Sequence, residues 1–345
     1  MTLSTEQIKS VVCGAAQILE EEGGLRFWRF TEHQQQLYSQ LRPVLTKIKN
    51  YRPTSITSAG VKLHFKTDSD KLFLKADVKK GCPRTFFAFD VVVDGALVGA
   101  MENFGDNPPP PGEPKTPYPL GIYEKEFCLG TGEKTVEVFF PWSVCPILLE
   151  VGLSDGSFLQ PVKRPKKWLV FGDSITQGYD ILHPSQHHIP RTAEKLNAEV
   201  YNKGIGGEIF FPPLADSPDD FQPDYITVAY GTNDLVHVDG SRFDEDVTLF
   251  FSSLRKHYPK AQIACITPIW RTTFNGPGNF DTIDNLEKRM AAAVSKVEGV
   301  KYIRGYDFIP QDTSLLSDLS VHPNDQGFVY YYESFCKEIE NAFNS

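Results

Sequence analysis

The chain has 345 residues, 41% of them hydrophobic and 23% charged, which is typical of a globular protein with sizeable buried cores. Its 35 Lys and Arg residues face 44 Asp and Glu residues, a formal net charge of -9, and no basic run is long enough to follow a phosphate backbone. These features argue against nucleic acid as a partner. No stretch approaches the roughly 20 apolar residues of a membrane span, and the N-terminus lacks a secretory signal, so we expect a cytoplasmic protein that does not bind membranes.

The cysteines are scattered and form no CxxC pair: Cys13, Cys82, Cys128, Cys145, Cys265 and Cys336. A chain of this length folds without covalent cross-links. We therefore expect reduced and mostly buried thiols rather than a disulfide framework.

Two helices are predicted at the start of the chain. Each begins with a capping box, in which a hydroxyl side chain precedes a glutamine by three residues: Ser4 with Gln7, and Thr31 with Gln34. The first helix should end at Gly23 and Gly24, and the second should end before Tyr51. The aromatic segment between them, residues 25–30, should be extended.

From about residue 54 to residue 160 the hydrophobic period becomes two, which indicates half-buried antiparallel strands. Asp94-Gly95 lies between two apolar runs and predicts a hairpin turn. This region should be a β-sandwich or jelly roll. The proline-rich stretch 107–119 cannot donate to a sheet, so we interpret it as an exposed, stiff loop. A PxxP ligand for another protein is the alternative.

Beyond Pro161 short apolar strands alternate with amphipathic helices. The strands are WLVF, EVYNK, YITVAY, QIACIT and KYIR, and the helices lie near residues 189–196, 243–257, 283–297 and 326–343. This alternation predicts a parallel sheet covered by helices on both faces, a three-layer α/β/α domain. We therefore expect two domains: residues 1–160, with the helices and the sandwich, and residues 161–345, with the parallel sheet.

Polar and glycine-rich turns follow the first three of these strands. Ser174 stands on the first strand-to-helix turn, where a serine is exposed and its own N-H can stabilise an anion. The second strand ends in a glycine block that includes Gly207, and the third is followed by Asn233, a neutral amide donor. Near the C-terminus His322 precedes the last helix and is a suitable base for a serine hydroxyl. Taken singly, each feature is equally an ordinary helix cap or turn.

Together, in this order, the segments GDSI, the glycine block, GTND and the histidine segment resemble the SGNH/GDSL hydrolase family. The resemblance covers roughly residues 166–345 and implies a flavodoxin-like sheet. It implies Ser174 as nucleophile and first oxyanion N-H, Gly207 as second donor, Asn233 as third donor, and His322 as base and later acid. Gly207, rather than Gly206, fills the family's glycine position.

The triad acid departs from the family pattern. The family's acid usually precedes the histidine by three residues, but Leu319 occupies that position and Asp318 stands four residues before His322. Either Asp318 still reaches Nδ1 of His322 through an extra loop residue, or a backbone carbonyl orients the imidazole instead.

A jelly roll ahead of such a domain is similar to the architecture of carbohydrate esterase family 2. This second resemblance implies a small-molecule or oligosaccharide ester as substrate, with acetyl as the acyl group. Tyr179 and Trp270 follow strands aimed at the site and are candidates to contact a sugar ring, although both also fit a core role. His183, His187 and His188 lie close together in the sequence, but no Cys, Asp or Glu pattern accompanies them, so they do not predict a metal site. The inferred chemistry requires neither metal nor cofactor.

The sequence therefore predicts a serine esterase that removes small acyl groups, through an acyl-enzyme on Ser174. The alternatives are a lipase or acylhydrolase for longer acyl chains, and a carbohydrate-binding protein that has lost catalysis. Peptide hydrolysis is disfavoured only by the family's precedent.

Overall fold

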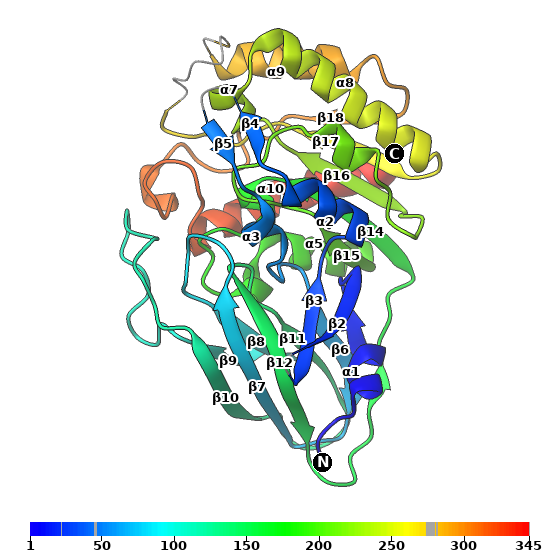
Figure 1. Cartoon of the computed structure of the whole chain (residues 1–345), viewed down its shortest axis with the longest axis vertical. Helices are drawn as coiled ribbons and strands as arrows, with labels where there is room; N and C mark the ends of the chain where they lie inside the picture. The colour runs from blue at the N-terminus through cyan, green and yellow to red at the C-terminus, as the bar shows by residue number, and fades with distance from the viewer. Residues whose placement is uncertain (22, 45–46, 274–279, 281, 345) are drawn as a thin grey trace.

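The computed structural model describes residues 1–21, 23–44, 47–273, 280 and 282–344, and it shows antiparallel sheets at one end of the molecule and a parallel sheet with helices at the other (Figure 1). One antiparallel sheet has the order β1 (Val12–Cys13), β6 (Lys62–Thr67), β11 (Lys134–Phe139), β8 (Ala88–Val93) and β9 (Ala96–Glu102), and β13 (Gln160–Pro161) also pairs with β6. The other has the order β10 (Gly121–Cys128), β7 (Lys71–Lys80), β12 (Val144–Leu153), β3 (Gly24–Trp28) and β2 (Gln17–Glu21).

Side chains from both sheets share one core, which confirms the predicted β-sandwich. Every second residue of β7 from Leu72 to Val78 is buried, and these side chains meet Leu63 and Phe65 of β6 in the same apolar cluster. The turn Asp94-Gly95 joins β8 to β9 with φ values of 49° and 84°, so the predicted hairpin is also confirmed. Positive φ at both residues matches the twist of the paired strands.

The prediction for the first helix is wrong at its C-terminal end. The capping box of Ser4 and Gln7 is present, but α1 (Thr5–Val11) stops at Val11, and residues 17–21 form strand β2. Strand β2 pairs with β3 along its whole length at the edge of the sandwich. Tertiary pairing therefore overrides a local sequence that would tolerate a helix.

The second helix also begins as predicted and ends early. The capping box of Thr31 and Gln34 starts α2 (Glu32–Ser39), which is followed by the short strands β4 (Arg42–Val44) and β5 (Lys47–Lys49) and by α3 (Arg52–Ser55). The segment before it, predicted to be extended, forms β3.

The parallel sheet has the order β15 (Ala198–Asn202), β14 (Lys166–Gly172), β16 (Tyr225–Ala229), β17 (Gln262–Ile266) and β18 (Val300–Ile303). All four pairings are parallel, and the order 2-1-3-4-5 is that of flavodoxin-like sheets. Short helical turns follow at α4 (Ser174–Gln177), η1 (Pro184–Gln186), α7 (Asp234–His237) and η2 (Thr313–Leu315).

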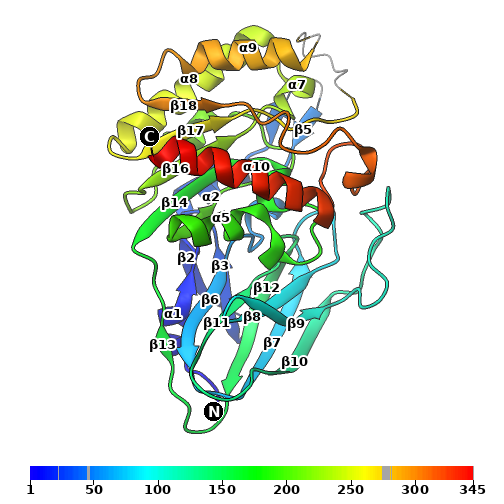
Figure 2. The ribbon, with the colours of Figure 1, turned by 180° about the vertical axis from the view of Figure 1, so that it is seen from behind.

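Helices cover both faces of this sheet, so the predicted three-layer arrangement is confirmed. Leu169 and Phe171 share a core with α6 (Pro212–Ala215), α8 (Gly240–His257) and α9 (Ile283–Val294). Their neighbours Trp168 and Val170 point the other way, into a core with α5 (His188–Leu196) and α10 (Asp325–Asn344). Figure 2 shows α5 and α10 in front of the sheet, on the face opposite to that seen in Figure 1.

The six cysteine thiols are free, and all except Cys128 are buried, as expected. Within the described ranges, no helix has both the length and the apolar character needed to cross a membrane.

The described residues of 29–57, which we call the bridging segment, pack on the parallel-sheet part of the chain. Phe30, Tyr38 and Tyr51 belong to the same core as α8 and α9. The fully buried guanidinium of Arg29 donates to the carbonyls of Asn202 and Gly204 at 2.8 and 2.9 Å. The division into residues 1–160 and 161–345 therefore stays a prediction, because part of the first range shares a core with the second.

Arg29→Met should destabilise the protein by about 3 kcal/mol, because it leaves several buried carbonyls without a donor. Arg29 also donates to the carbonyls of Thr54 and Thr57, so the side chain joins both ends of the bridging segment to the turn after β15. Urea unfolding measures the change. The control Arg242→Met removes a half-exposed arginine paired with Asp246 and should cost less than about 1 kcal/mol. Equal effects of the two substitutions would contradict the bridging role of Arg29.

Candidate active site

Strand β14 ends in a tight turn that places Ser174 at the start of α4. A Cβ on Gly172 would lie 2.0 Å from Thr176 Oγ1, so only glycine lets the strand approach the helix this closely. The Asp173 carboxylate accepts a hydrogen bond from the N-H of Ile175 at 2.9 Å and caps the helix. Ser174 is 4% exposed, so neighbouring groups cover most of its surface.

The structure brings the hydroxyl of Ser174 and the imidazole of His322 together from positions far apart in the chain. Ser174 Oγ lies 2.8 Å from His322 Nε2, and His322 Nδ1 lies 2.6 Å from Asp318 Oδ2. With the Nδ1 proton donated to a carboxylate, Nε2 carries the lone pair that faces the hydroxyl. Such a row of groups can take a proton from a serine hydroxyl.

The loop before α10 accommodates the extra residue between Asp318 and His322 through an unusual backbone conformation. Leu319 has φ of 57°, in the left-handed region that residues with a Cβ seldom adopt. The curled loop lets Asp318 Oδ1 accept from the backbone N-H groups of Ser320, Val321 and His322 at 2.7 to 3.1 Å. These bonds leave Oδ2 for the imidazole.

The contacts of Asp318 keep it ionised. Burial alone would raise the pKa of this carboxyl, but the hydrogen bond and charge of His322 and the backbone N-H groups outweigh burial. They hold the pKa of Asp318 well below its usual range. The carboxylate is therefore charged when the imidazole becomes protonated.

A second carboxylate, Asp180, lies beside the imidazole and was missed in the sequence analysis. Its Oδ2 is 3.7 Å from His322 Nδ1 and accepts from Ser317 Oγ at 2.7 Å. Arg84, from the sandwich, binds both oxygens of Asp180 at 2.8 and 3.1 Å. Asp180 stands six residues after Ser174, and this closeness in the sequence is a signal that could place it at the site. Nothing near Arg84 in the sequence points to its contact with Asp180.

The predicted pocket aromatics lie at the site in different ways. Tyr179 stacks on His322 with ring centroids 5.5 Å apart, and it is 5% exposed because Trp142 and Arg84 cover its other sides. Trp270 is partly buried against the core that includes Tyr179. Tyr179 therefore supports the imidazole, and contact of either ring with a substrate stays a prediction.

The glycine block after β15 packs against α4, the short helix that begins at Ser174. Gly206 N-H donates to Gln177 Oε1 at 2.8 Å and is already occupied. Within the described residues, no acceptor lies within hydrogen-bonding distance of Gly207 N-H. Gly207 has φ of 82°, which glycine adopts without strain. The N-H of Ser174, at the start of α4, likewise has no partner inside its helix.

Asn233 lies at the start of α7, next to the same loop. Its Nδ2 donates to the carbonyl of Glu208 at 2.9 Å, which holds the amide against the glycine block. An amide nitrogen has two hydrogens, so one donor remains for a ligand. The roles of the N-H groups of Ser174 and Gly207 and of the Asn233 amide as oxyanion donors stay predictions.

The three clustered histidines take separate roles. His183 Nδ1 lies 2.8 Å from Asp90, His187 Nε2 lies 2.9 Å from the carbonyl of Ile175, and His188 is buried among aromatic rings.

In the described part of the chain, the ligand atoms of Asp180, Asp318 and His322 lie within 4.8 Å of one another. A cation would fit this spacing poorly, because Arg84 already supplies a positive charge there.

A serine hydroxyl, an imidazole and a carboxylate in one hydrogen-bonded row, at the carboxyl edge of a parallel sheet, define the class of serine hydrolases. Residues 170–328 match the model of the GDSL-like lipase/acylhydrolase family. This part of the chain is similar to GDSL-like acylhydrolases, and the protein is a carboxylic ester hydrolase.

Other proteins resemble the chain over part or most of its length. The uncharacterized lipoprotein YqeF of Bacillus subtilis is 29% identical over 181 residues, which cover 47% of this chain and 71% of that protein. The salicylyl-acyltransferase SsfX3 from a tetracycline biosynthetic pathway superposes with a TM-score of 0.75 at 20% identity, covering 96% of this chain and 94% of that chain. A family two carbohydrate esterase from Clostridium thermocellum, in complex with cellohexaose, gives 0.67 at 15% identity, covering 96% and 99%. The two solved structures share the fold of both parts of this chain.

Asp318→Asn should lower kcat about a thousandfold or more while KM changes little, because an amide stabilises the imidazolium less than a carboxylate does. Steady-state hydrolysis of p-nitrophenyl acetate measures both constants. Asp312→Asn, in the same exposed loop region and capping η2, is the matched control and should retain wild-type rates. A loss below tenfold for Asp318→Asn would mean that another group, such as Asp180, orients His322.

Proposed function

We propose that the protein removes small acyl groups, above all acetyl groups, from carbohydrate esters, with Ser174 as nucleophile and His322 as general base. The observation that supports the chemistry is the 2.8 Å contact between Ser174 Oγ and His322 Nε2, with Asp318 on the far side of the imidazole. The distance is that of a hydrogen bond through which a proton passes.

The first half of the reaction forms an acyl-enzyme. Ser174 Oγ attacks the ester carbonyl carbon while its proton passes to His322 Nε2. The carbonyl oxygen becomes an oxyanion, which accepts from the N-H groups of Ser174 and Gly207 and from the amide of Asn233. When the tetrahedral intermediate collapses, the bond to the alcohol breaks and His322 returns the proton to the leaving oxygen.

The second half releases the acyl group. Water attacks the acyl carbonyl carbon and loses a proton to His322 Nε2, and the same donors hold the new oxyanion. Collapse breaks the bond to Ser174 Oγ, which regains the proton, and the carboxylic acid leaves. The ionised Asp318 stabilises the imidazolium in both halves.

Two observations support a small acyl group on a sugar. Ser174 is 4% exposed, and we expect a small acyl group to reach so covered a hydroxyl more easily than a long chain does. The carbohydrate esterase of Clostridium thermocellum, whose structure holds cellohexaose, shares the fold over 96% of this chain. A fold likeness at this level of identity supports the sugar only as a proposal.

A carbohydrate-binding protein without catalysis is the rival from another class. The short contacts of Ser174, His322 and Asp318 favour the enzyme, because a decayed site has no need to keep them aligned. Lipase activity on long acyl chains is the rival within the enzyme class.

Ser174→Ala should abolish ester hydrolysis, with a loss of at least about a thousandfold. The variant has no hydroxyl that His322 can activate as a nucleophile. Hydrolysis of p-nitrophenyl acetate and covalent labelling by a serine-directed phosphonate, detected by mass spectrometry, measure the effect. Ser295→Ala, at the exposed end of α9, should keep activity and labelling. Wild-type turnover in Ser174→Ala would exclude this nucleophile, and an unlabelled wild-type protein would favour the binding protein.

The acyl and alcohol parts of the proposal are tested with substrate series. We expect kcat/KM for p-nitrophenyl esters to fall by about tenfold or more from acetate to octanoate, because the longer chain does not fit beside Ser174. We also expect acetate release from acetylated xylo-oligosaccharides, measured by an enzymatic acetate assay. A preference for octanoate would contradict the proposal of a small acyl group. Activity confined to aryl esters would contradict the proposal of a carbohydrate substrate.

A further inference from the structure

We propose that Tyr51, in the bridging segment, is a positioning residue that fixes the oxyanion donor Gly207. The inference rests on the proposed function, since it assigns a role within the same site. Tyr51 lies between the sandwich strands β3 and β6, and its contact with the site joins residues 156 positions apart in the sequence.

The hydroxyl of Tyr51 donates to the carbonyl of Gly207 at 2.8 Å. Burial raises the pKa of Tyr51, so the phenol remains protonated and keeps its donor. The peptide that follows Gly207 is thereby held from outside the hydrolase domain.

The peptide on the other side of the donor is held as well. Gly206 N-H is bound by Gln177 Oε1 at 2.8 Å. The Gly207 N-H belongs to the peptide between these two fixed points. A glycine has a wide choice of φ and ψ, so its N-H direction is set by what holds the flanking peptides. Without Tyr51, one of the two constraints is lost.

Tyr51 is itself held rigidly. It is 2% exposed, and the Arg42 guanidinium lies 4.4 Å from the centre of its ring. Arg42 forms an ion pair with the buried carboxylate of Glu208, the residue next to Gly207, and Glu208 also accepts from Asn233. The tyrosine, the arginine and the loop therefore form one packed unit.

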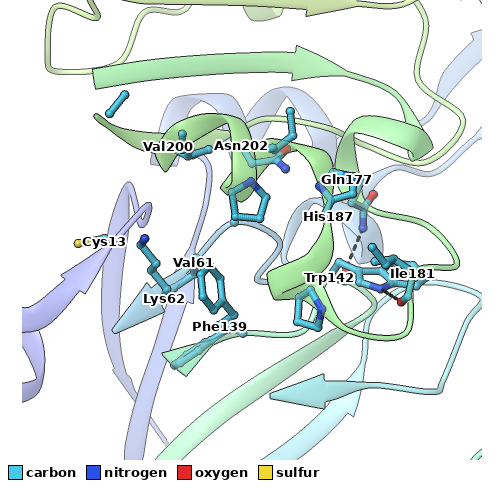
Figure 3. A pocket seen from close by; sticks show the side chains of 17 residues that line it. Cys13, Val61, Lys62, Phe139, Trp142, Gln177, Ile181, His187, Val200 and Asn202 are labelled. Atoms are coloured by element: carbon cyan, nitrogen blue, oxygen red, sulfur yellow. Dashed lines mark hydrogen bonds between the residues drawn. The ribbon is translucent and has the colours of Figure 1, made fainter. Parts of the chain in front are cut away.

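The second constraint also depends on residues outside the hydrolase domain. Gln177 Nε2 donates to the carbonyl of Trp142 at 2.9 Å and to Thr57 Oγ1 at 3.1 Å. Figure 3 shows Gln177 directed at Trp142 beside a cavity between the sandwich and the hydrolase domain. The cavity volume is about 40 Å³, room for little more than water and too small for a sugar ester.

Tyr51→Phe is the test, because it removes one hydroxyl and keeps the ring that packs on Arg42. We expect kcat for p-nitrophenyl acetate to fall about tenfold to a hundredfold, with KM within about twofold, since the donor acts mainly on the oxyanion. The inhibition constant of a trifluoromethyl ketone, which forms a tetrahedral oxyanion on the serine, should rise by a similar factor. Turnover is expressed per serine titrated with phosphonate, so unfolded protein does not contribute.

Tyr123→Phe is the matched control. Tyr123 also donates to a backbone carbonyl, that of Pro119, at 2.9 Å, but it lies in β10 of the sandwich. It should leave kcat and inhibition unchanged. A general loss of stability would lower the melting temperature of Tyr51→Phe without changing turnover per titrated site or the affinity for the ketone.

Wild-type kcat and ketone affinity in Tyr51→Phe would overturn the role of Tyr51. A rise in KM with unchanged kcat would overturn it as well. The Ser174→Ala result separates this failure from that of the proposed function. If Ser174→Ala is inactive while Tyr51→Phe is fully active, only the positioning role fails. If Ser174→Ala is active, the nucleophile is wrong and the oxyanion assignment falls with it.

Discussion

The hydrogen bond between His322 Nδ1 and the Asp318 carboxylate decides which imidazole nitrogen faces Ser174. Three backbone N-H groups bind the other oxygen of Asp318, so the carboxylate cannot rotate without losing several bonds at once. The left-handed Leu319 makes this arrangement possible with one residue more than the family spacing. The backbone strain at Leu319 is thus offset by the hydrogen bonds that the ionised Asp318 carboxylate accepts on both oxygens.

The hydrolase part of the fold could be predicted from the sequence because its signals are local. Strands β14, β16 and β17 are short, mostly buried apolar runs, and β14, β15 and β16 are each followed by a turn that contains glycine or a capping side chain. The topology then brings the turns after β14, β15 and β16 to one edge of the sheet, the edge at which Ser174, Gly207 and Asn233 are predicted to lie. Strand β2 was mistaken for helix because its state depends on pairing with β3, a contact that periodicity does not encode.

The supporting residues of the site could not be predicted in the same way. Arg84 and Asp180 are 96 positions apart, and Tyr51 and Gly207 are 156 apart. Neither pair belongs to a recognisable spacing, since Arg84 and Asp180 lie in loops of different parts of the fold and Tyr51 comes from the bridging segment. The family spacing left the role of Asp318 open for a related reason: a single backbone dihedral angle, at Leu319, decides whether its carboxylate reaches the imidazole.

The seam between the first 160 residues and the hydrolase domain is held by buried charges as well as by apolar packing. Arg42 pairs with Glu208 beside Gly207, and Arg84 pairs with Asp180 beside His322. Buried ion pairs add little net stability, because desolvation offsets their attraction, but a misplaced partner leaves a charge buried and unpaired. We therefore expect the two pairs to disfavour other docked arrangements of the sandwich and the bridging segment. Since one pair lies behind the oxyanion loop and the other behind the imidazole, the same docking that satisfies the charges also aligns both halves of the site.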